Sequence, residues 1–417
     1  MFSNHVELNL NISCRRVCSL NWNASEISGK KDNSSSEEEE EDDVILRNTG
    51  DAKKLKFLVG SCHSENNELL RLEFDQDAHE VYESAVYGHP SGPVWSLSPS
   101  HHNAGLIATC GGSTPSNMQT TIWKLPIVDE SPQYDENDEG IQRADLLMQT
   151  VVMVDDGHSD AQQAQKSEII WSPHNSKEFM TVNSRSIQSW HFKGDGADEK
   201  AHFSLMSAPS NLSPLGRVPA VYDVHDSNRI CVAVGCDLKF WDTRSRIKEA
   251  TATLAQAHKN CILDVDVNPH RPHTFVTSGQ EGLLKFWDVR MLSKSANSRM
   301  QPIKVVKGGH THWISRVVYN TQHDQLLLSA GTDSFLNLWR LSSISSAPIL
   351  EVDDEETAKP DQSNKPASSD IRVLQFECQE SLYDVTWLDA WTFASVTHDG
   401  QVIVNQVPSQ EKYKILL

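Results

Sequence analysis

The chain has 417 residues, with 57 acidic and 37 basic side chains and a net charge of −20. This balance argues against nucleic-acid binding, which needs clustered cations, and favours a basic protein partner. No apolar run approaches the ~18 residues of a membrane helix, and the N-terminus lacks a signal-peptide core, so we expect no direct membrane insertion. The eight cysteines form no Cys-x-x-Cys pair, which indicates free thiols in a reducing, cytoplasmic compartment.

Residues 1–54 form a divergent N-terminal segment. Residues 6–12 alternate apolar and polar side chains, so they are the first candidate for a strand that closes a ring of blades, and residues 16–20 are the second. The tract 32–50 includes seven consecutive acidic residues, Glu37 to Asp43, after a serine-rich stretch. Such a tract cannot bury enough apolar surface to offset its chain entropy, so we expect it to be disordered.

From residue 55 to residue 408 the chain repeats short strands of alternating polarity, separated by Gly, Asp and Asn turns and without a helical period. The two clearest copies lie 52 residues apart. In each copy an acidic residue lies 23 positions after a histidine, and a tryptophan lies 6 positions after the acidic residue. The first set is His258, Glu281 and Trp287, and the second is His310, Asp333 and Trp339. A repeat of this size predicts a propeller or a solenoid, and the strand pattern favours blades.

Five looser copies bring the number of candidate blades to seven. We therefore predict an all-β fold, a seven-bladed propeller over residues 55–408. The excess length over ~40 to 45 residues per blade must be loop. The acidic inserts 126–166 and 351–370 are predicted to be disordered loops, and residues 409–417 a C-terminal tail.

The repeated histidine, acid and tryptophan have a structural explanation. In such blades the acid accepts a hydrogen bond from the histidine, the histidine bonds a strand hydroxyl, and that hydroxyl meets the tryptophan N–H. We expect two such relays, one of His310, Ser329, Asp333 and Trp339, and one of His258, Ser278, Glu281 and Trp287. The glutamate should fit less well than the aspartate.

The sequence contains no motif that indicates catalysis, cofactor binding or metal binding. His310, Ser329 and Asp333 are the residue types of a nucleophilic triad, but the same set recurs with tryptophan in a second blade, and a Gly-x-Ser-x-Gly elbow is absent from the sequence. No Cys or carboxylate set completes a metal site around His101 and His102. We therefore expect a protein that is not an enzyme and that holds no cofactor and no metal.

Two groups of residues are candidates for partner binding. Large aromatic side chains stand at the start of the inner strands, where they either anchor a partner or pack between blades. They are Trp95, Tyr222, Trp313 and Tyr383. The second group is the arginine of two Trp-Asp-x-Arg motifs, Arg244 and Arg290, which either contacts a partner or pairs locally.

The dipeptides Trp241-Asp242 and Trp287-Asp288 resemble the WD40 family. Within it, residues 319–328, residues 342–348 and the terminal Tyr413-Lys414-Ile415-Leu416-Leu417 resemble the group of EARP and GARP complex-interacting proteins, whereas the first ~50 residues do not match that group. The resemblance implies a monomeric, non-catalytic adaptor that binds the multisubunit EARP/GARP vesicle-tethering complexes. It would support endosomal recycling and retrograde trafficking, in the cytoplasm and on endosomes and the trans-Golgi network through its partners. The Trp-Asp-x-Arg pair suggests an alternative, a substrate receptor of a cullin-RING ubiquitin ligase.

Overall fold

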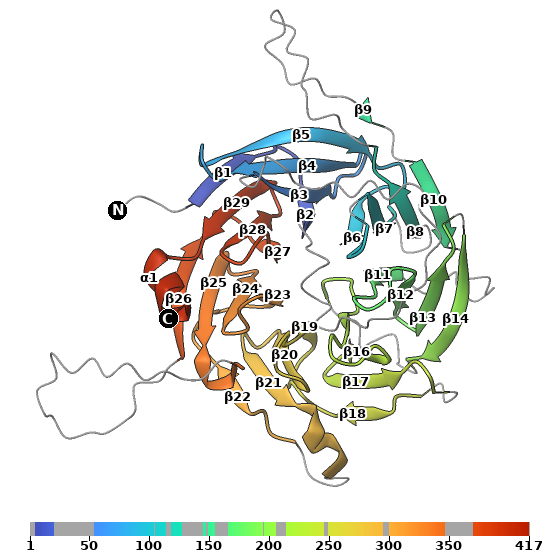
Figure 1. Cartoon of the computed structure of the whole chain (residues 1–417), viewed down its shortest axis with the longest axis vertical. Coiled ribbons are helices and arrows are strands. Elements are labelled where there is room, and N and C mark those ends of the chain that lie inside the picture. Colours follow the sequence, from blue (N-terminus) through green and yellow to red (C-terminus); the bar gives the residue numbers. More distant parts are fainter. Residues whose placement is uncertain are drawn as a thin grey trace, which may run out of the picture.

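The computed structural model describes residues 5–20, 54–103, 105–113, 118–126, 145–146, 149–154, 166–194, 196–205, 214–245, 249–294, 300–346 and 370–416. Within these ranges the strands form seven sheets that stand as blades around a central axis (Figure 1). The predicted all-β, seven-bladed propeller is confirmed. The predicted disordered acidic tract 32–50 and most of the inserts 126–166 and 351–370 lie outside the described residues.

The first four blades follow one another along the chain. Blade one contains β2 (Cys14–Ser19), β3 (Lys54–Ser61), β4 (Glu68–Asp75), β5 (Glu80–Gly88) and the short parallel β9 (Asp145–Leu146). Blade two contains β6 (Val94–Pro99), β7 (Leu106–Gly111), β8 (Gln119–Lys124) and β10 (Gln149–Val154). Blade three contains β11 (Lys166–Trp171), β12 (Glu178–Asn183), β13 (Ser186–Phe192) and β14 (Ala197–Ser204). Blade four contains β15 (Ala220–Tyr222), β16 (Arg229–Val234), β17 (Asp237–Asp242) and β18 (Ala252–Leu254).

Three further blades complete the ring. Blade five contains β19 (Ile262–Val267), β20 (Thr274–Gly279), β21 (Leu284–Asp288) and β22 (Lys304–Val306). Blade six contains β23 (Ile314–Tyr319), β24 (Leu326–Gly331), β25 (Phe335–Leu341) and β26 (Asp370–Glu377). Blade seven contains β27 (Leu382–Trp387), β28 (Thr392–Thr397), β29 (Gln401–Gln406) and β1 (His5–Asn9). The helical segments are η4 (Val289–Lys294), η5 (Ser342–Ile344) and α1 (Ser409–Leu416).

The N-terminal segment closes the ring. Strand β1 pairs antiparallel with β29, with His5 opposite Asn405 and Asn9 opposite Gln401. The closing strand therefore comes from the first candidate region, although it begins one residue earlier and ends at Asn9 instead of residue 12. The second candidate, residues 16–20, lies largely in β2, the inner strand of blade one. The edge that blade seven would otherwise expose is thus paired.

Three predicted boundaries are corrected by the structure. The propeller begins at His5 and not at residue 55, because β1 is the outer strand of blade seven and β2 is the inner strand of blade one. The predicted insert 126–166 contains β9 and β10, and β10 is the outer strand of blade two. The predicted tail 409–417 contains helix α1.

The hydrophobic core lies between neighbouring blades. The second strand of each blade, counted from the axis, is mostly buried, and all six residues of β20 are an example. One cluster joins blade seven to blade one and packs Val402 and Val404 against Phe57 and Phe74. Because every blade depends on both neighbours, the ring forms one cooperative unit.

The inner strands share an irregularity that shapes the central channel. In six of them the pairing with the second strand skips one residue near the start, which is a β-bulge. The residue that follows each bulge is polar. These residues are Arg16, Ser96, Glu168, Asp264, Arg316 and Asp384. The bulges thus place a polar side chain at the same level in six of the seven blades.

Candidate functional site

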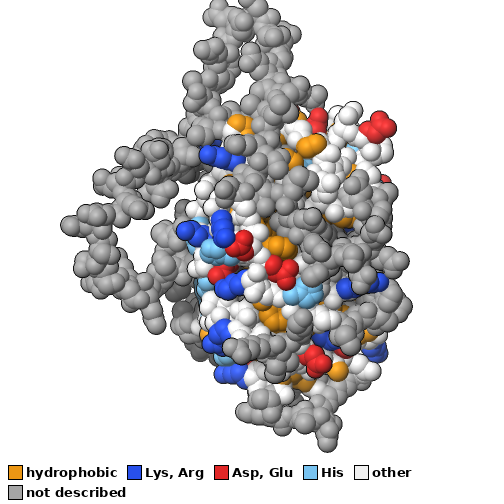
Figure 2. Space-filling model, turned by 90° about the vertical axis from the view of Figure 1, so that its right-hand side faces the viewer, with side chains coloured by type: hydrophobic (Ala, Val, Ile, Leu, Met, Phe, Trp, Pro, Cys, Tyr) orange, Lys and Arg blue, Asp and Glu red, His pale blue; other side chains and the backbone are white. Residues whose placement is uncertain are grey.

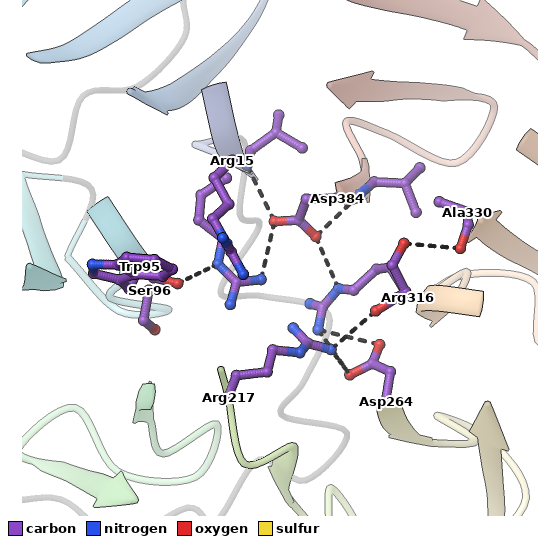
Figure 3. Close-up of polar contacts among 12 residues, drawn as sticks. Arg15, Trp95, Ser96, Arg217, Asp264, Arg316, Ala330 and Asp384 are labelled. Carbon is purple, nitrogen blue, oxygen red and sulfur yellow. Dashed lines mark hydrogen bonds and ion pairs between the residues drawn. The ribbon is translucent and has the colours of Figure 1, made fainter. Parts of the chain in front are cut away.

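The polar residues of the inner strands meet as an ion network, and Figure 3 shows part of it. Arg316 of β23 places Nε 3.0 Å from the Asp384 carboxylate of β27 and donates from Nη1 to Asp264 of β19 at 3.2 Å. Arg217, which precedes β15, also bonds Asp264 and lies 3.9 Å from Glu168 of β11. Arg16 of β2 lies 3.7 Å from Asp384 and donates from Nε to the Trp95 carbonyl at 2.6 Å. We call Arg16, Glu168, Arg217, Asp264, Arg316 and Asp384 the channel ring.

Hydrogen bonds that side chains accept from backbone N–H groups also join neighbouring blades at three places around the channel. Asp264 accepts a hydrogen bond from the Val317 N–H at 2.9 Å, and Asp384 accepts one from the Val17 N–H at 3.2 Å. Ser96 accepts one from the Ile169 N–H at 3.2 Å. In each case the accepting side chain belongs to the residue just after the bulge of one blade. The donating N–H belongs to the next blade, two residues after the bulged residue of that blade. The repeated geometry indicates that these hydrogen bonds hold neighbouring blades together.

Burial and charge act against each other in the channel ring. Burial, together with the nearby Arg217, lowers the pKa of Arg16 to about 10. Burial raises the pKa of Glu168, although Arg217 and Arg16 oppose that shift. Burial also disfavours the charge on Arg316, but Asp264 and Asp384 outweigh it and raise the pKa of that arginine. Paired charges of this kind can hold blades together, and they present no nucleophile next to a base.

The relay of blade six contains the four expected residues. His310 Nε2 lies 2.8 Å from Ser329 Oγ, and Trp339 Nε1 donates to the same oxygen at 2.9 Å. His310 Nδ1 lies 3.0 Å from Asp333 Oδ1. Burial disfavours the charge on Asp333, but the interactions with His310 and the hydrogen bonds from the Thr311 and Phe335 N–H groups together outweigh it and lower the pKa of the carboxyl to about 2.

The relay of blade five has a different hydroxyl from the one predicted. Thr277 Oγ1 lies 2.8 Å from His258 Nε2 and accepts from Trp287 Nε1 at 2.9 Å. Ser278 points to the other face of the strand and donates to the Ile314 carbonyl of the next blade. The assignment of Ser278 was wrong because side chains alternate along a strand, so a shift by one residue changes the face. Glu281 Oε1 lies 3.6 Å from His258 Nδ1, a looser contact than the aspartate makes in blade six.

A third relay was missed in blade two. His89 Nε2 lies 2.9 Å from Thr109 Oγ1, and Trp123 Nε1 donates to that oxygen at 2.8 Å. His89 Nδ1 bonds the Gly92 carbonyl instead of an acid. The signal in the sequence was a histidine 20 residues before a threonine, close to the 19 residues that separate His310 from Ser329.

The aromatic candidates at the start of the inner strands have different environments. The guanidinium of Arg15 lies 4.4 Å from the ring centre of Trp95 and 5.0 Å from that of Tyr383, so this chain already supplies a cation to both rings. Arg15 also donates to the Leu215 carbonyl at 2.5 Å. Trp313 is half-buried and stacks on His312 with ring centres 5.1 Å apart.

Tyr222 is not a partner-binding residue of the surface. Its side chain is 3% exposed and packs between blades three and four with Phe203, Ile230 and Trp241. Burial raises its pKa well above the ordinary value. The prediction failed because β15 is short and unbulged, so its last residue lies in the core and not at the channel mouth.

The arginines of the two Trp-Asp-x-Arg motifs adopt the same local geometry. Arg244 bonds the carboxylate of Asp242, with Nη2 to Oδ2 at 2.7 Å, and Arg290 bonds Asp288 in the same way at 2.5 Å. Both arginine side chains remain mostly exposed. The hydrogen bond from Arg244 lowers the pKa of Asp242, and Arg290 does the same for Asp288. Local pairing is therefore present, and it leaves both guanidiniums on the surface.

Helix α1 carries a candidate that sequence reasoning missed. Tyr413 is 68% exposed and Leu416 is 65% exposed, three positions apart on one helix. The helix is fixed to blade six because its buried Glu411 forms an ion pair with Arg340, whose Nε lies 3.2 Å from the carboxylate, and Ile415 packs on the core between blades six and seven. The terminal Tyr-Lys-Ile-Leu-Leu sequence contains this spacing and could have revealed it.

In the part of the chain that the structure describes, no group of three or more His, Cys, Asp and Glu side chains could hold a metal ion. The same part contains no helix that is long and apolar enough to cross a membrane. Figure 2 shows acidic, basic and histidine side chains interspersed with scattered apolar ones on one side of the ring.

The comparison with known families fits this architecture. A model of the EIPR1 β-propeller family matches residues 44–339, well over half of the chain. The chain belongs to the EIPR1 β-propeller family. The resemblance inferred from the sequence is thereby confirmed.

Relatives match most of this chain and nearly the whole of their own length. The EARP and GARP complex-interacting protein 1 of Macaca fascicularis is 27% identical over 387 residues, which cover 88% of this chain and 95% of the relative. The EARP-interacting protein 1 of Caenorhabditis elegans is 26% identical over 378 residues, 88% of this chain and 94% of the relative. The WD repeat-containing protein DWA2 of Arabidopsis thaliana is 25% identical over 362 residues, 86% and 91% respectively.

Proposed function

We propose that this protein is a non-catalytic adaptor that binds subunits of the EARP and GARP complexes. The support comes from relatives named for that interaction, which this chain matches over 94–95% of their length. A closed ring held by buried ion pairs and relays suits the role, because a rigid platform loses little conformational freedom on binding. We further propose that the protein acts in endosomal recycling and retrograde trafficking, from the cytoplasm, and reaches endosomes and the trans-Golgi network through these partners.

The absence of catalysis is part of the proposal. The residues that could imitate a triad bond one another and a tryptophan N–H, and Ser329 is fully buried behind Trp339. A nucleophile must reach its substrate, and this hydroxyl has no exposed surface from which to do so.

Affinity purification of the tagged protein tests the adaptor role, with tether subunits as the expected co-purifying proteins. Trp313→Ala and the pair Tyr413→Ala with Leu416→Ala should each weaken capture by ~2 kcal/mol or more if they are anchors. Tyr383→Ala and Trp95→Ala test the channel mouth, where Arg15 occupies the aromatic faces. Circular dichroism must first show that each variant is folded. Capture that survives in all of these variants would contradict the choice of anchors, and purification without any tether subunit would contradict the function.

The alternative of a cullin-RING substrate receptor is supported by one observation. Arg244 and Arg290 are exposed in matching positions of consecutive blades. The double variant Arg244→Ala with Arg290→Ala should leave tether capture intact and remove cullin adaptor peptides, if any are present in the wild-type sample. Loss of the tether in this variant would place the binding surface on the opposite end of the propeller from Trp313.

A further inference from the structure

One end of the propeller carries a histidine in blade after blade. The inner strands all run in the same direction, so the turns that follow them meet at one end, which we call the exit end. In blades two to six each of these turns contains at least one histidine. They are His101 and His102, His174, His225, His270 and His273, and His323. Blade seven has Trp391 in the corresponding turn.

Two of these imidazole rings form hydrogen bonds with backbone carbonyls of the following blade. His174 Nε2 lies 2.9 Å from the Asp223 carbonyl, and His225 Nε2 lies 2.9 Å from the Asn268 carbonyl. A carbonyl only accepts, so Nε2 carries the hydrogen and the second nitrogen, Nδ1, is the one that gains a proton. Protonation therefore adds a charge without breaking the bond between blades. Both side chains are exposed, as is His270.

The carboxylates near these histidines already have partners. Asp223 lies 3.1 Å and Asp226 3.4 Å from the guanidinium of Arg229, which also lies 3.3 Å from His273 Nδ1. Glu178 bonds Lys200 at 2.7 Å. Asp324 accepts from the Ser346 N–H and hydroxyl, and Asp389 accepts from Gln76 and the Trp391 N–H. Protonated histidines would therefore add to the positive charge of Lys177 and Arg271 in the same turns.

The far end of this row is packed, with an aromatic contact and a lysine above it. The rings of His323 and Trp391 lie 4.4 Å apart, and Lys412 of α1 lies 5.9 Å from the Trp391 ring centre. Burial lowers the pKa of His323, and the nearby His270 lowers it further. The row thus runs from exposed, chargeable rings in blades three to five to an aromatic and cationic contact in blade seven.

We propose that His174, His225, His270 and Arg271, which we call the exit-end arc, bind an acidic protein segment, and that this binding strengthens as the pH falls from 7.5 to 6.0. An extended segment suits the arc because the cations are spaced one or two per blade along a curve and are separated by paired carboxylates. The chain as a whole carries a net charge of −20, so the segment is held by the local cations of the arc and not by the overall charge. The inference does not depend on which complex the protein serves.

The test uses the full-length protein and a fluorescein-labelled peptide of alternating glutamate and serine, followed by fluorescence anisotropy at low salt. Binding should be about tenfold tighter at pH 6.0 than at pH 7.5, because histidine is the side chain that gains charge in this range. The triple variant His174→Gln, His225→Gln, His270→Gln should lose this pH dependence. A second variant, His270→Arg, should bind more tightly than wild type at pH 7.5, a gain that misfolding could not produce.

Matched controls separate the exit-end arc from histidines in general. The triple variant His63→Gln, His312→Gln, His398→Gln removes three exposed histidines at the opposite end of the ring and should bind the peptide as wild type does. A peptide with lysine in place of glutamate should not bind. The proposal is overturned if both triple variants behave alike, if His270→Arg gives no gain, or if vesicles containing phosphatidylserine, and not the peptide, depend on the arc.

Discussion

The channel ring predicts a large loss of stability from a single substitution, Asp264→Ala. The Asp264 carboxylate bonds Arg217, lies 3.2 Å from Arg316 and accepts the Val317 N–H at 2.9 Å. Alanine removes all three contacts and leaves a buried guanidinium without its closest carboxylate. Breaking a buried pair in this way costs roughly 3–5 kcal/mol. That is a large share of the roughly 5–15 kcal/mol that stabilises an ordinary folded protein.

Urea denaturation followed by tryptophan fluorescence measures this loss, with Asp198→Ala as the matched control. Asp198 pairs with Lys193, but both side chains are more than half exposed, so its removal should cost at most ~1 kcal/mol. Asp264→Asn keeps one acceptor oxygen and should fall between the two. If Asp264→Ala were no less stable than Asp198→Ala, the channel ring would not be what holds the blades together.

Three further predictions concern the relay, the ring closure and the pH dependence of stability. Asp333→Ala should lower the free energy of unfolding, measured by urea denaturation, by ~1 to 3 kcal/mol, and Glu281→Ala should lower it less, because the glutamate contact is longer. The pKa of Asp333 is lowered in the folded state, so this carboxylate stabilises the fold above its unfolded pKa. The difference in stability between wild type and Asp333→Ala should therefore disappear as the pH falls from ~4 towards 2. Equal losses in the two variants at neutral pH would contradict the geometric argument. Deletion of residues 1–13 removes β1 and should lower the melting temperature and promote association in light scattering, whereas an unchanged melting curve would count against closure by β1. Desolvation raises the pKa of Asp266 to about 7, so between pH ~4 and ~7 the folded protein binds a proton that the unfolded chain does not, and it loses stability as the pH rises through that window. The stability of Asp266→Asn should depend less on pH in this window. An unaltered slope would show that other groups cause the dependence.

The fold class could be predicted from the sequence, because the repeated pattern is local. A blade is a run of neighbouring strands, and the spacing of His310, Asp333 and Trp339 is set within one such run. Turn residues and alternating polarity also act over a few positions, so seven copies could be counted and their order along the chain read directly. The same local pattern placed the relay of blade six, and the spacing of 19 residues from histidine to hydroxyl would have placed Thr277 as well.

Contacts between residues far apart in the sequence could not be predicted and became clear only from the folded ring. The pairing of β1 with β29 joins residues almost 400 positions apart, and it exists because the last blade needs a fourth strand when the ring closes. The channel ring depends on bulges that turn one side chain per inner strand towards the axis, and no local spacing signals that Arg16 and Asp384 face one another. Tyr222 looked like a surface anchor and is buried, because the length of β15 and the packing of blade three decide its burial. Such contacts follow from the closure of seven blades around one axis, which no single stretch of sequence encodes.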